Sequence, residues 1–515
     1  MQLSGLACFC VAIAAGLATS ASARSVPKDL YLKARADGSY HDLYHRDGPS
    51  PNNRLIRQKR EQNALGSDNA AERRQASPTN GLGLPYPTDE ASFAKVSDIR
   101  VACNPYYLPE IAAIQHNYPA PWLDQAITGA TILSGDSEAQ SVWQSIQSKI
   151  PSNVAVKQRD TSTNTLITSS YDVTNDPDCW WTASQCHSPK HNAIPQDVYD
   201  CPEPSTWGLT LDEQTAPTLI FQCTHNAFYD FLEQHNQKAT LYYIGSNVLD
   251  WPLQAQRGLA DGHQICVHTW SHQPMTTLPS ENVFAELWYT AKIIKDVVGV
   301  APRCWRPPYG DVDDRVRAIA NALGLATHIW TADTNDYLVT PGGPSSTAAI
   351  QSNYASIFAT ASASPSAGII VLTHEINAGT MNLFESEYAN IIKNFKHVVP
   401  ITACLNESNP YEPNSGISYP GFNAYISGQV MPSGLPSSFS IKNQAYNPLS
   451  ISSAAAAMST SASQSGSSGK STSSNRPTTS SGTGNSAGAA SVPLSGSVIA
   501  GLAVSMVIGT LVVLL

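Results

Sequence analysis

Two histidines, His268 and His272, stand four positions apart in the run Ile-Cys-Val-His-Thr-Trp-Ser-His. Imidazole side chains at this spacing can bind a divalent metal ion, which activates water for hydrolysis. Histidine is also intermediate in its burial preference, so the pair taken alone fits a core histidine followed by a loop residue equally well. The other polar residues of the chain have to decide between these two interpretations.

Polar side chains recur at the ends of several short apolar runs. They are Asp212 and Glu213; Arg306 and Tyr309; Asp333, Asp336 and Tyr337; and His374 and Glu375. Carboxylates, an arginine and further histidines can supply metal ligands, a general base and a general acid. Each motif alone has a plain alternative. Asp212 and Glu213 fit a solvated acidic turn, Arg306 fits a surface ion pair, and Asp333 fits a turn cap. With the pair His268 and His272, polar residues recur at five run ends, which favours one shared site.

The apolar runs alternate with helical patterns between residues 207 and 405. The expected strands are Trp207–Leu211, Ala239–Gly245, Gln264–His268, Cys304–Arg306, Ala326–Thr331, Gly368–Thr373 and Val398–Ala403. The expected helices are Asn226–His235, Asn282–Val298, Asp313–Leu323 and Leu383–Phe395. This alternation predicts parallel strands joined by crossover helices. We therefore expect an α/β fold, a distorted (β/α) barrel of about seven strands, with its active site at the C-terminal ends of the strands.

Four motifs fall at these strand ends in a fixed order. They are His268-Thr-Trp-Ser-His272, Arg306-Pro-Pro-Tyr-Gly310, Asp333-Thr-Asn-Asp336 and Leu372-Thr-His374-Glu375. In these motifs the stretch from about 207 to 405 resembles the polysaccharide deacetylase family, carbohydrate esterase family four with the NodB-homology fold, and its fungal chitin deacetylases in particular. The family's first motif, Thr-Phe-Asp-Asp-Gly-Pro, is altered here to Thr-Leu-Asp-Glu-Gln-Thr-Ala-Pro, residues 210–217.

The resemblance implies metal-dependent hydrolysis of an N-acetyl group. His268 and His272 would bind the metal, with Zn²⁺ as the commonest occupant and Co²⁺ as the alternative. Glu213 takes the position of the family's carboxylate ligand, where the family has aspartate. Its side chain is one methylene longer, so the backbone, the metal position or an added water would have to adapt.

The resemblance also implies the acid and base of the reaction. Asp212 would be the general base, and Arg306 would keep it ionised and oriented. His374 would protonate the leaving amine as general acid. Asp336 would lie behind His374 and raise the pKa of the imidazole by favouring its charged form.

Three further residues would meet the substrate. The backbone N–H of Tyr309 would help to hold the negative charge of the tetrahedral intermediate, and Tyr337 and Leu372 would wall the acetyl pocket. The expected reaction converts cell-wall chitin to chitosan and acetate. Two alternatives stay open: a catalytically impaired, chitin-binding cell-wall mannoprotein, favoured by the change to Glu213, and the same chemistry on another acetylated polysaccharide.

Composition agrees with a neutral substrate. Charged residues make up 14% of the chain and the formal net charge is -10. A nucleic-acid binder needs a basic face, so this balance argues against a nucleic-acid partner. We expect a monomer.

The first 206 residues are expected to hold three segments: a signal peptide at 1–23, a disordered, propeptide-like segment at 24–76, and an extension at 77–206. Of the ten cysteines, Cys8 and Cys10 lie in the signal peptide, which leaves eight. An even number in a secreted chain predicts disulfides, but eight cysteines allow 105 pairings. Trp180 and Trp181 stand between Cys179 and Cys186, where a buried aromatic pair is favoured over a sugar-stacking surface.

The C-terminal part is rich in Ser, Thr, Gly and Ala. Residues 428–485 are expected to form an O-glycosylated stalk. Asn406 begins an Asn-Glu-Ser glycosylation sequon. Small residues at 485–487, a spacer and an apolar tail predict a GPI signal with attachment at Asn485 and removal of 486–515. These features predict a secreted protein held by lipid at the plasma membrane and in the cell wall.

Overall fold

A nine-stranded sheet organises the part of the chain that the computed structural model describes. The described residues are 87–102, 108–120, 129–160, 165–191, 193–213, 225–339, 345–361 and 366–449, and they all lie in the unit Met1–Ala462. The expected signal peptide, the 24–76 segment, the GPI segment with Asn485, most of the stalk and the altered loop after Glu213 fall outside these residues.

The strands follow the order β3-β10-β4-β5-β6-β7-β8, with β11 paired to β4 and β9 to β10. Their bounds are β3 Asp200–Cys201, β4 Thr206–Asp212, β5 Thr240–Tyr243, β6 Gln264–Val267, β7 Cys304–Trp305, β8 Ala326–Thr327, β9 Ala332–Asp333, β10 Gly368–His374 and β11 His397–Val399. All pairs are parallel except β3 with β10. Seven strands on one curled path confirm the predicted α/β fold.

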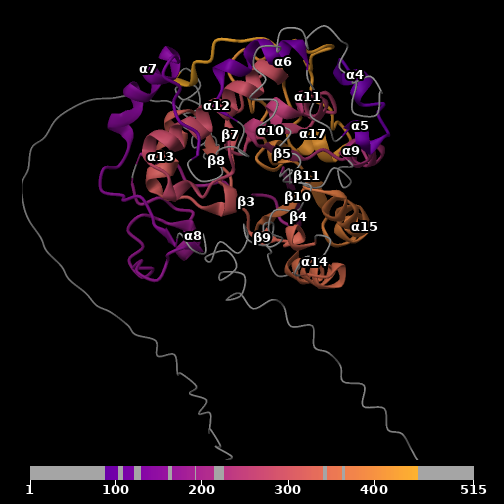
Figure 1. Ribbon diagram of the computed structural model, residues 1–515. Coiled ribbons are helices and arrows are strands. Elements are labelled where there is room, and N and C mark those ends of the chain that lie inside the picture. The colour runs from indigo at the N-terminus through magenta and orange to yellow at the C-terminus, as the bar shows by residue number, and fades with distance from the viewer. Residues whose placement is uncertain are drawn as a thin grey trace, which may run out of the picture. The chain divides into compact units, whose positions relative to one another are not determined.

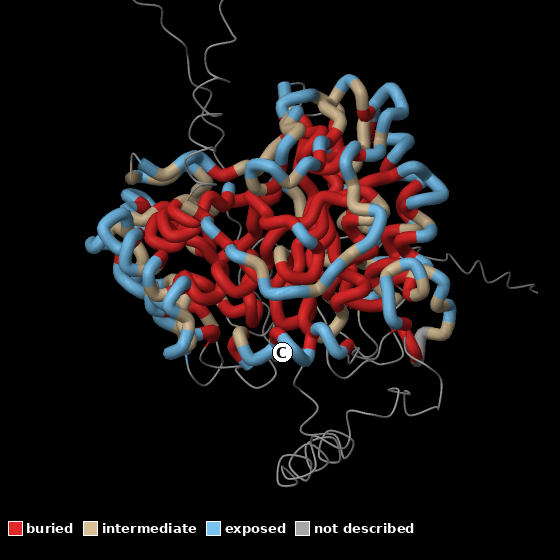
Figure 2. The backbone as a smooth tube through the Cα atoms, turned by 90° about the horizontal axis from the view of Figure 1, so that it is seen from above, coloured by how far each residue is buried: buried red, intermediate tan, exposed pale blue. Residues whose placement is uncertain are grey.

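Helices surround the sheet (Figure 1). Their bounds are α4 Glu90–Phe93, α5 Ile99–Ala102, α6 Pro109–Ile114, α7 Ser137–Ile146, α8 Trp181–Ser184, α9 His225–Gln234, α10 Gly245–Asp250, α11 Pro252–Ala260, α12 Ser280–Val298, α13 Asp314–Ala322, α14 Thr347–Ala361, α15 Ala378–Asn394, α16 Ile401–Cys404 and α17 Phe422–Ile426. Buried backbone gathers in the interior (Figure 2). Within the described ranges, none of the helices is long and apolar enough to cross a bilayer.

The two ends of the strand order are joined by a stretch from the N-terminal extension. The N–H of Val198 donates to the carbonyl of Thr327 at the end of β8, and the N–H of Ile329 donates to the carbonyl of Val198, both at 2.8 Å. Two residues later β3 pairs with β10. Residues 198–201 therefore close the barrel, and the extension contributes to the sheet itself.

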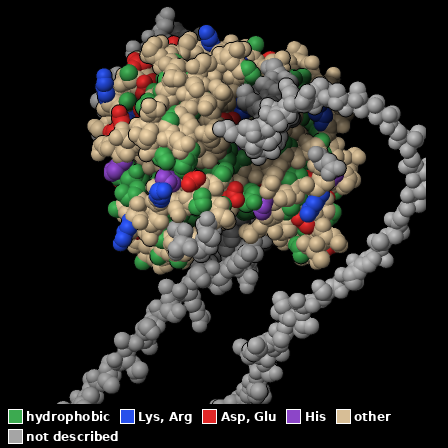
Figure 3. All heavy atoms as spheres, turned by 180° about the vertical axis from the view of Figure 1, so that it is seen from behind, with side chains coloured by type: hydrophobic (Ala, Val, Ile, Leu, Met, Phe, Trp, Pro, Cys, Tyr) green, Lys and Arg blue, Asp and Glu red, His purple; other side chains and the backbone are tan. Residues whose placement is uncertain are grey.

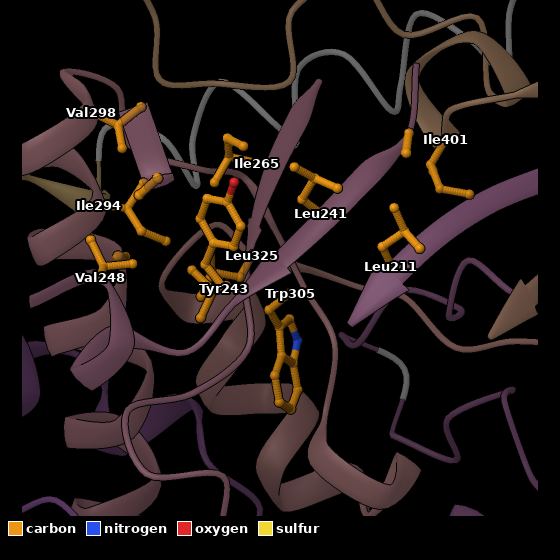
Figure 4. Packing of buried hydrophobic residues seen from close by; sticks show 14 of the residues in the cluster. Leu211, Leu241, Tyr243, Val248, Ile265, Ile294, Val298, Trp305, Leu325 and Ile401 are labelled. Carbon is orange, nitrogen blue, oxygen red and sulfur yellow. The ribbon is translucent and has the colours of Figure 1, made fainter. Parts of the chain in front are cut away.

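Side chains alternate between the two faces of each strand, as the period of two requires. Odd-numbered residues such as Leu211, Leu241 and Ile265 point to the helices, in one apolar cluster with Val248, Ile294 and Ile401 (Figure 4). Even-numbered residues point to the barrel interior and form a polar layer. Its members include Thr210, Asp212, Thr240, Tyr242, Gln264, Cys266, Cys304 and Arg306.

Six of the eight cysteines form disulfides in the described residues: Cys179–Cys186, Cys201–Cys404 and Cys266–Cys304. Cys103 and Cys223 lie outside them. Trp180 and Trp181 are buried, as expected, and the indole N–H of Trp180 donates to Asp311 at 2.9 Å.

One predicted strand is wrong in its second half. The structure ends β11 at Val399, and the helix α16 begins at Ile401. Pro400 separates them: it has no N–H for the strand ladder, yet its fixed φ suits the start of a helix. Asn406 follows α16 and is exposed, as a glycosylation site must be. Its use as one stays a prediction.

Candidate active site

The predicted base, Asp212, ends β4 in the barrel interior and is 3% exposed. Arg306 at the end of β7 donates to the Asp212 carboxylate at 2.7 Å and to the Thr210 hydroxyl at 2.8 Å. Arg306 is fully buried, which excludes the surface ion pair considered above. A charge-assisted hydrogen bond at this distance fixes the orientation of the carboxylate.

Two aromatic rings that the sequence analysis did not single out position Arg306. Its guanidinium carbon lies 4.1 Å from the ring centroid of Tyr242 and 5.5 Å from that of Trp330. Cation–π contacts of this kind stabilise a buried guanidinium. The available signals were the strand position of Tyr242, in register with Asp212, and the place of Trp330 just before the Asp333 motif.

The two histidines of the opening motif lie side by side, with ring centroids 4.9 Å apart. His268 donates through Nδ1 to the carbonyl of Arg306 at 2.9 Å, so in the neutral ring Nε2 carries the lone pair. Nε2 lies 3.6 Å from Oδ2 of Asp212. Nδ1 of His272 lies 3.2 Å from the hydroxyl of Tyr309. Burial lowers the pKa of His268, although Asp212 opposes the shift, so its imidazole is the neutral form that binds metals.

His374 ends β10 opposite Asp212, and the two residues are paired in the strand register. Its Nδ1 lies 2.6 Å from one oxygen of Asp336, and its backbone N–H donates to the other at 2.8 Å. Burial alone would lower the pKa of His374, but the charge and hydrogen bond of Asp336 outweigh it and raise the pKa. A carboxylate and an imidazole thus face each other from neighbouring strands.

Of the three predicted substrate contacts, Tyr337 and Leu372 lie near His374, and Tyr309 lies beside His272. Tyr309 has a left-handed backbone, with φ 59°, in the single turn η7 Pro308–Gly310. Tyr337, in η8 Asp336–Leu338, places its ring centroid 5.3 Å from that of His374. Leu372 precedes His374 by two residues on the same face of β10 and is buried. Their roles toward a substrate stay predictions.

Known proteins resemble the chain in this region. The family model described as polysaccharide deacetylase matches residues 199–328. Chitin deacetylase 2 of Cryptococcus neoformans var. grubii is 44% identical over 348 residues, 66% of this chain and 73% of that protein. Chitin deacetylase of Amylomyces rouxii is 44% identical over 311 residues, 59% of this chain and 71% of that protein. The chain belongs to the polysaccharide deacetylase family.

The solved chitin deacetylase from Colletotrichum lindemuthianum is 22% identical, with a TM-score of 0.38, and the match covers 42% of this chain and 96% of that one. Figure 3 shows one face of the present chain, over which charged side chains of both signs are scattered.

The altered first motif sets this family member apart at Glu213. The Glu213 carboxylate is buried and accepts the N–H of Ile244 at 3.2 Å. Burial raises the pKa of Glu213 to about 8, although Ile244 and Asn247 favour the charged form. Burial, and after it the neighbouring Glu213, also raise the pKa of Glu375 well above its usual value. Glu213 and Glu375 are thus two buried carboxyl groups whose surroundings favour the neutral form.

The site fits a divalent metal in part. Both histidines have Nδ1 engaged, an arrangement that orients Nε2 for a metal. Across the described ranges, however, the one group with three potential ligand atoms within 4.8 Å of one another is Asp176, Cys179 and Cys186. A disulfide already joins its two cysteines, so they offer no thiolate. The structure does not gather Glu213 with the two histidines, and its role as a ligand stays a prediction.

Proposed function

We propose that the chain is a metal-dependent deacetylase that removes N-acetyl groups from chitin, which yields chitosan and acetate. The fungal relatives above are named chitin deacetylases, which supports this substrate. The observation that carries the proposal is the register pair of Asp212 and His374. It places a carboxylate held by Arg306 opposite an imidazole whose pKa Asp336 raises.

Hydrolysis of an amide needs a base and an acid in turn. Asp212 takes a proton from the attacking water as a C–O bond forms at the acetyl carbonyl. The backbone N–H of Tyr309 stabilises the negative charge on the carbonyl oxygen. His374 gives its proton to the amine nitrogen as the C–N bond breaks. Acetate and a free amine leave, and Tyr337 and Leu372 wall the acetyl group.

His268 and His272 would hold a divalent metal, Zn²⁺ in the first place and Co²⁺ as the alternative. When bound, this ion polarises the carbonyl and makes water more acidic. Glu213 is the proposed third ligand. It would have to leave the N–H of Ile244 and lose its proton. Because burial raises the pKa of Glu213 to about 8, its neutral form predominates near neutral pH, and metal binding would have to favour the ionised form.

The test is acetate release from chitin oligomers with metal supplied. The wild type should be active, and Asp212→Asn should lose about 10²–10⁴-fold in rate while it still binds metal. Glu213→Asp restores the family's ligand and should keep or raise activity. A wild type without activity, together with a Glu213→Asp protein that gains it, would identify an inactivated, chitin-binding member of the family instead.

We further propose that a GPI lipid holds the protein at the plasma membrane and in the cell wall, with attachment at Asn485. The small residues at 485–487 and the apolar tail support this proposal. A chain truncated after Gly484 should be released into the medium, whereas the full chain should be released only by a phospholipase that cleaves such anchors. Surface retention of the truncated chain would contradict the proposal.

A further inference from the structure

The loop that links the two metal-site histidines has an unusual backbone. Thr269 and His272 both have left-handed φ values, 68° and 53°, although neither is glycine. Such conformations are sparsely populated by residues with a Cβ and persist only when surrounding contacts hold them. The spacing of the His268 and His272 imidazoles depends on this loop, so whatever holds it also sets the site.

A single buried carboxylate accepts the donors at the centre of that loop. Glu286, in the middle of α12, is fully buried. One of its oxygens accepts the backbone N–H groups of Trp270 and Ser271, both at 2.8 Å. The other accepts the hydroxyl of Ser271 at 2.5 Å and the N–H of Ala130 at 2.6 Å. Three of the four donors thus come from the two residues at the centre of the loop.

The surroundings leave the loop little room to move. A Cβ on Gly245 would lie 2.6 Å from the Trp270 ring and 2.7 Å from the hydroxyl of Thr290 on α12. The N–H of Gly245 donates to the carbonyl of Thr269 at 2.9 Å. The Trp270 indole N–H donates to the carbonyl of Ala120 at 3.0 Å. The loop is therefore clamped between α10, α12 and the N-terminal extension.

We propose that Glu286 is a positioning residue, which fixes the loop conformation and thereby the geometry of the His268–His272 pair. The inference rests on the proposed function, because it takes these histidines to be metal ligands. Glu286 contacts neither histidine in the bonds described above and acts through the Trp270–Ser271 backbone. Glu286 lies on a helix of 19 residues, which holds its carboxylate in a fixed place. Removal of a residue that hydrogen-bonds the ligands of a metal site from outside typically weakens metal binding by about 10–100-fold.

The test compares Glu286→Gln with Glu387→Gln in the full chain. Glu387 is also a buried helix glutamate, but its oxygens accept the side chains of Gln351 and Asn390, away from the site. A glutamine at 286 places an NH₂ group against donors that need an acceptor. We expect Zn²⁺ affinity, measured by chelator competition, to fall about 10–100-fold for Glu286→Gln and not for Glu387→Gln. Excess Zn²⁺ should restore the turnover number.

A second measurement does not involve the metal. Hydrogen exchange of a peptide covering residues 268–276, in the metal-free protein, should be faster in Glu286→Gln than in Glu387→Gln. If Glu286→Gln does not fold, Ser271→Ala, which removes one donor only, should show a smaller change in the same direction. Equal metal affinity and equal exchange in the two glutamine variants would overturn the inference. A wild type that binds Zn²⁺ but releases no acetate would overturn the proposed function alone.

Discussion

His374 illustrates how its neighbours set the chemistry of one residue. Burial disfavours its charged form, whereas Asp336 supplies both a carboxylate charge and a hydrogen bond at 2.6 Å that favour it. The net effect is a raised pKa. A general acid must be protonated when it acts, so a raised pKa extends activity to higher pH.

We predict that Asp336→Asn moves the alkaline limb of the pH profile of kcat/KM to lower pH. Loss of the carboxylate charge should lower the pKa of His374, by about 1 unit or more, and the rate should fall as well. The matched control is Asp333→Asn, since Asp333 accepts the N–H of Asn335 at 2.8 Å and makes a smaller contribution to the pKa of His374. An alkaline limb that does not move in Asp336→Asn would exclude His374 as the acid.

We also predict that Glu213 makes the stability of the metal-free protein depend on pH. Its pKa is raised to about 8 in the folded state, so the neutral acid favours folding at low pH, and this contribution is lost as pH rises from about 4 to 8. Glu213→Gln cannot titrate, so its free energy of unfolding should rise relative to wild type between pH 5 and pH 8. Urea unfolding at both pH values measures the difference. Parallel pH dependence of the two proteins would show that Glu213 is charged throughout.

The sequence could predict which residues meet but not how Glu213 is oriented. The strand ends of Asp212, His268 and Arg306 follow from apolar runs of ordinary length. The orientation of the Glu213 side chain depends on the backbone N–H of Ile244, which follows the neighbouring strand β5, and on burial of the carboxyl group in the packed protein. Such contacts are set by the packed fold and leave no spacing signal in the chain.

Some strands and helices of the protein could be predicted from the sequence more clearly than others. The strands β4, β5, β6 and β10 lie within a residue or two of their expected bounds, because each is an apolar run closed by polar residues. The helices α10 and α11 were not predicted. In α11 the polar residues Gln254, Gln256 and Arg257 are buried as well as the apolar ones, since Gln256 donates to the carbonyl of Val297 and Arg257 to Asp230. A helix buried all round shows no apolar stripe.

The disulfide Cys266–Cys304 joins neighbouring strands two residues before His268 and Arg306. We predict that the Cys266→Ala/Cys304→Ala protein loses about 2–4 kcal/mol of unfolding free energy, measured in urea. Metal affinity should also fall, because β6 and β7 carry these two site residues. Removal of Cys179–Cys186, which closes a loop of only 7 residues, should cost less. Equal losses from the two disulfides would contradict this account.

At the scale of the whole molecule, the N-terminal extension is part of the barrel. Residues 198–201 close the sheet, and the guanidinium of Arg317 on α13 donates twice to buried Asp197, at 2.8 and 2.7 Å. The sequence predicted a barrel beginning at Trp207, because the closing stretch is too short to form a recognisable run. Its pairing with β8 and β10 is decided by strands far along the chain.

We predict that a chain starting at residue 207 will not unfold cooperatively in urea, whereas one starting at residue 87 will. The shorter chain lacks Val198, Asp197 and Cys201, so β8 would have an unpaired edge, β10 would lose β3, and buried Arg317 would lose both of its hydrogen bonds to Asp197. If the chain from residue 207 unfolds in urea as cooperatively as the longer chain, the extension is not needed for a stable barrel.

The strand β10 lies between β3 and β4 in the sheet, so the barrel cannot be completed until β10 has been synthesised. Cys201 and its partner Cys404 are separated by 203 residues, a stretch that a ribosome needs about 10–40 s to translate at 5–20 residues per second. Throughout that interval the Cys201 thiol is present while the nearby Cys179 and Cys186 are already available for mispairing. Any wrong bond that Cys201 forms in this interval would have to be undone by thiol exchange before Cys404 can pair with it. His374 lies on the late strand β10, so the proposed acid–base pair of Asp212 and His374 is complete only near the end of synthesis.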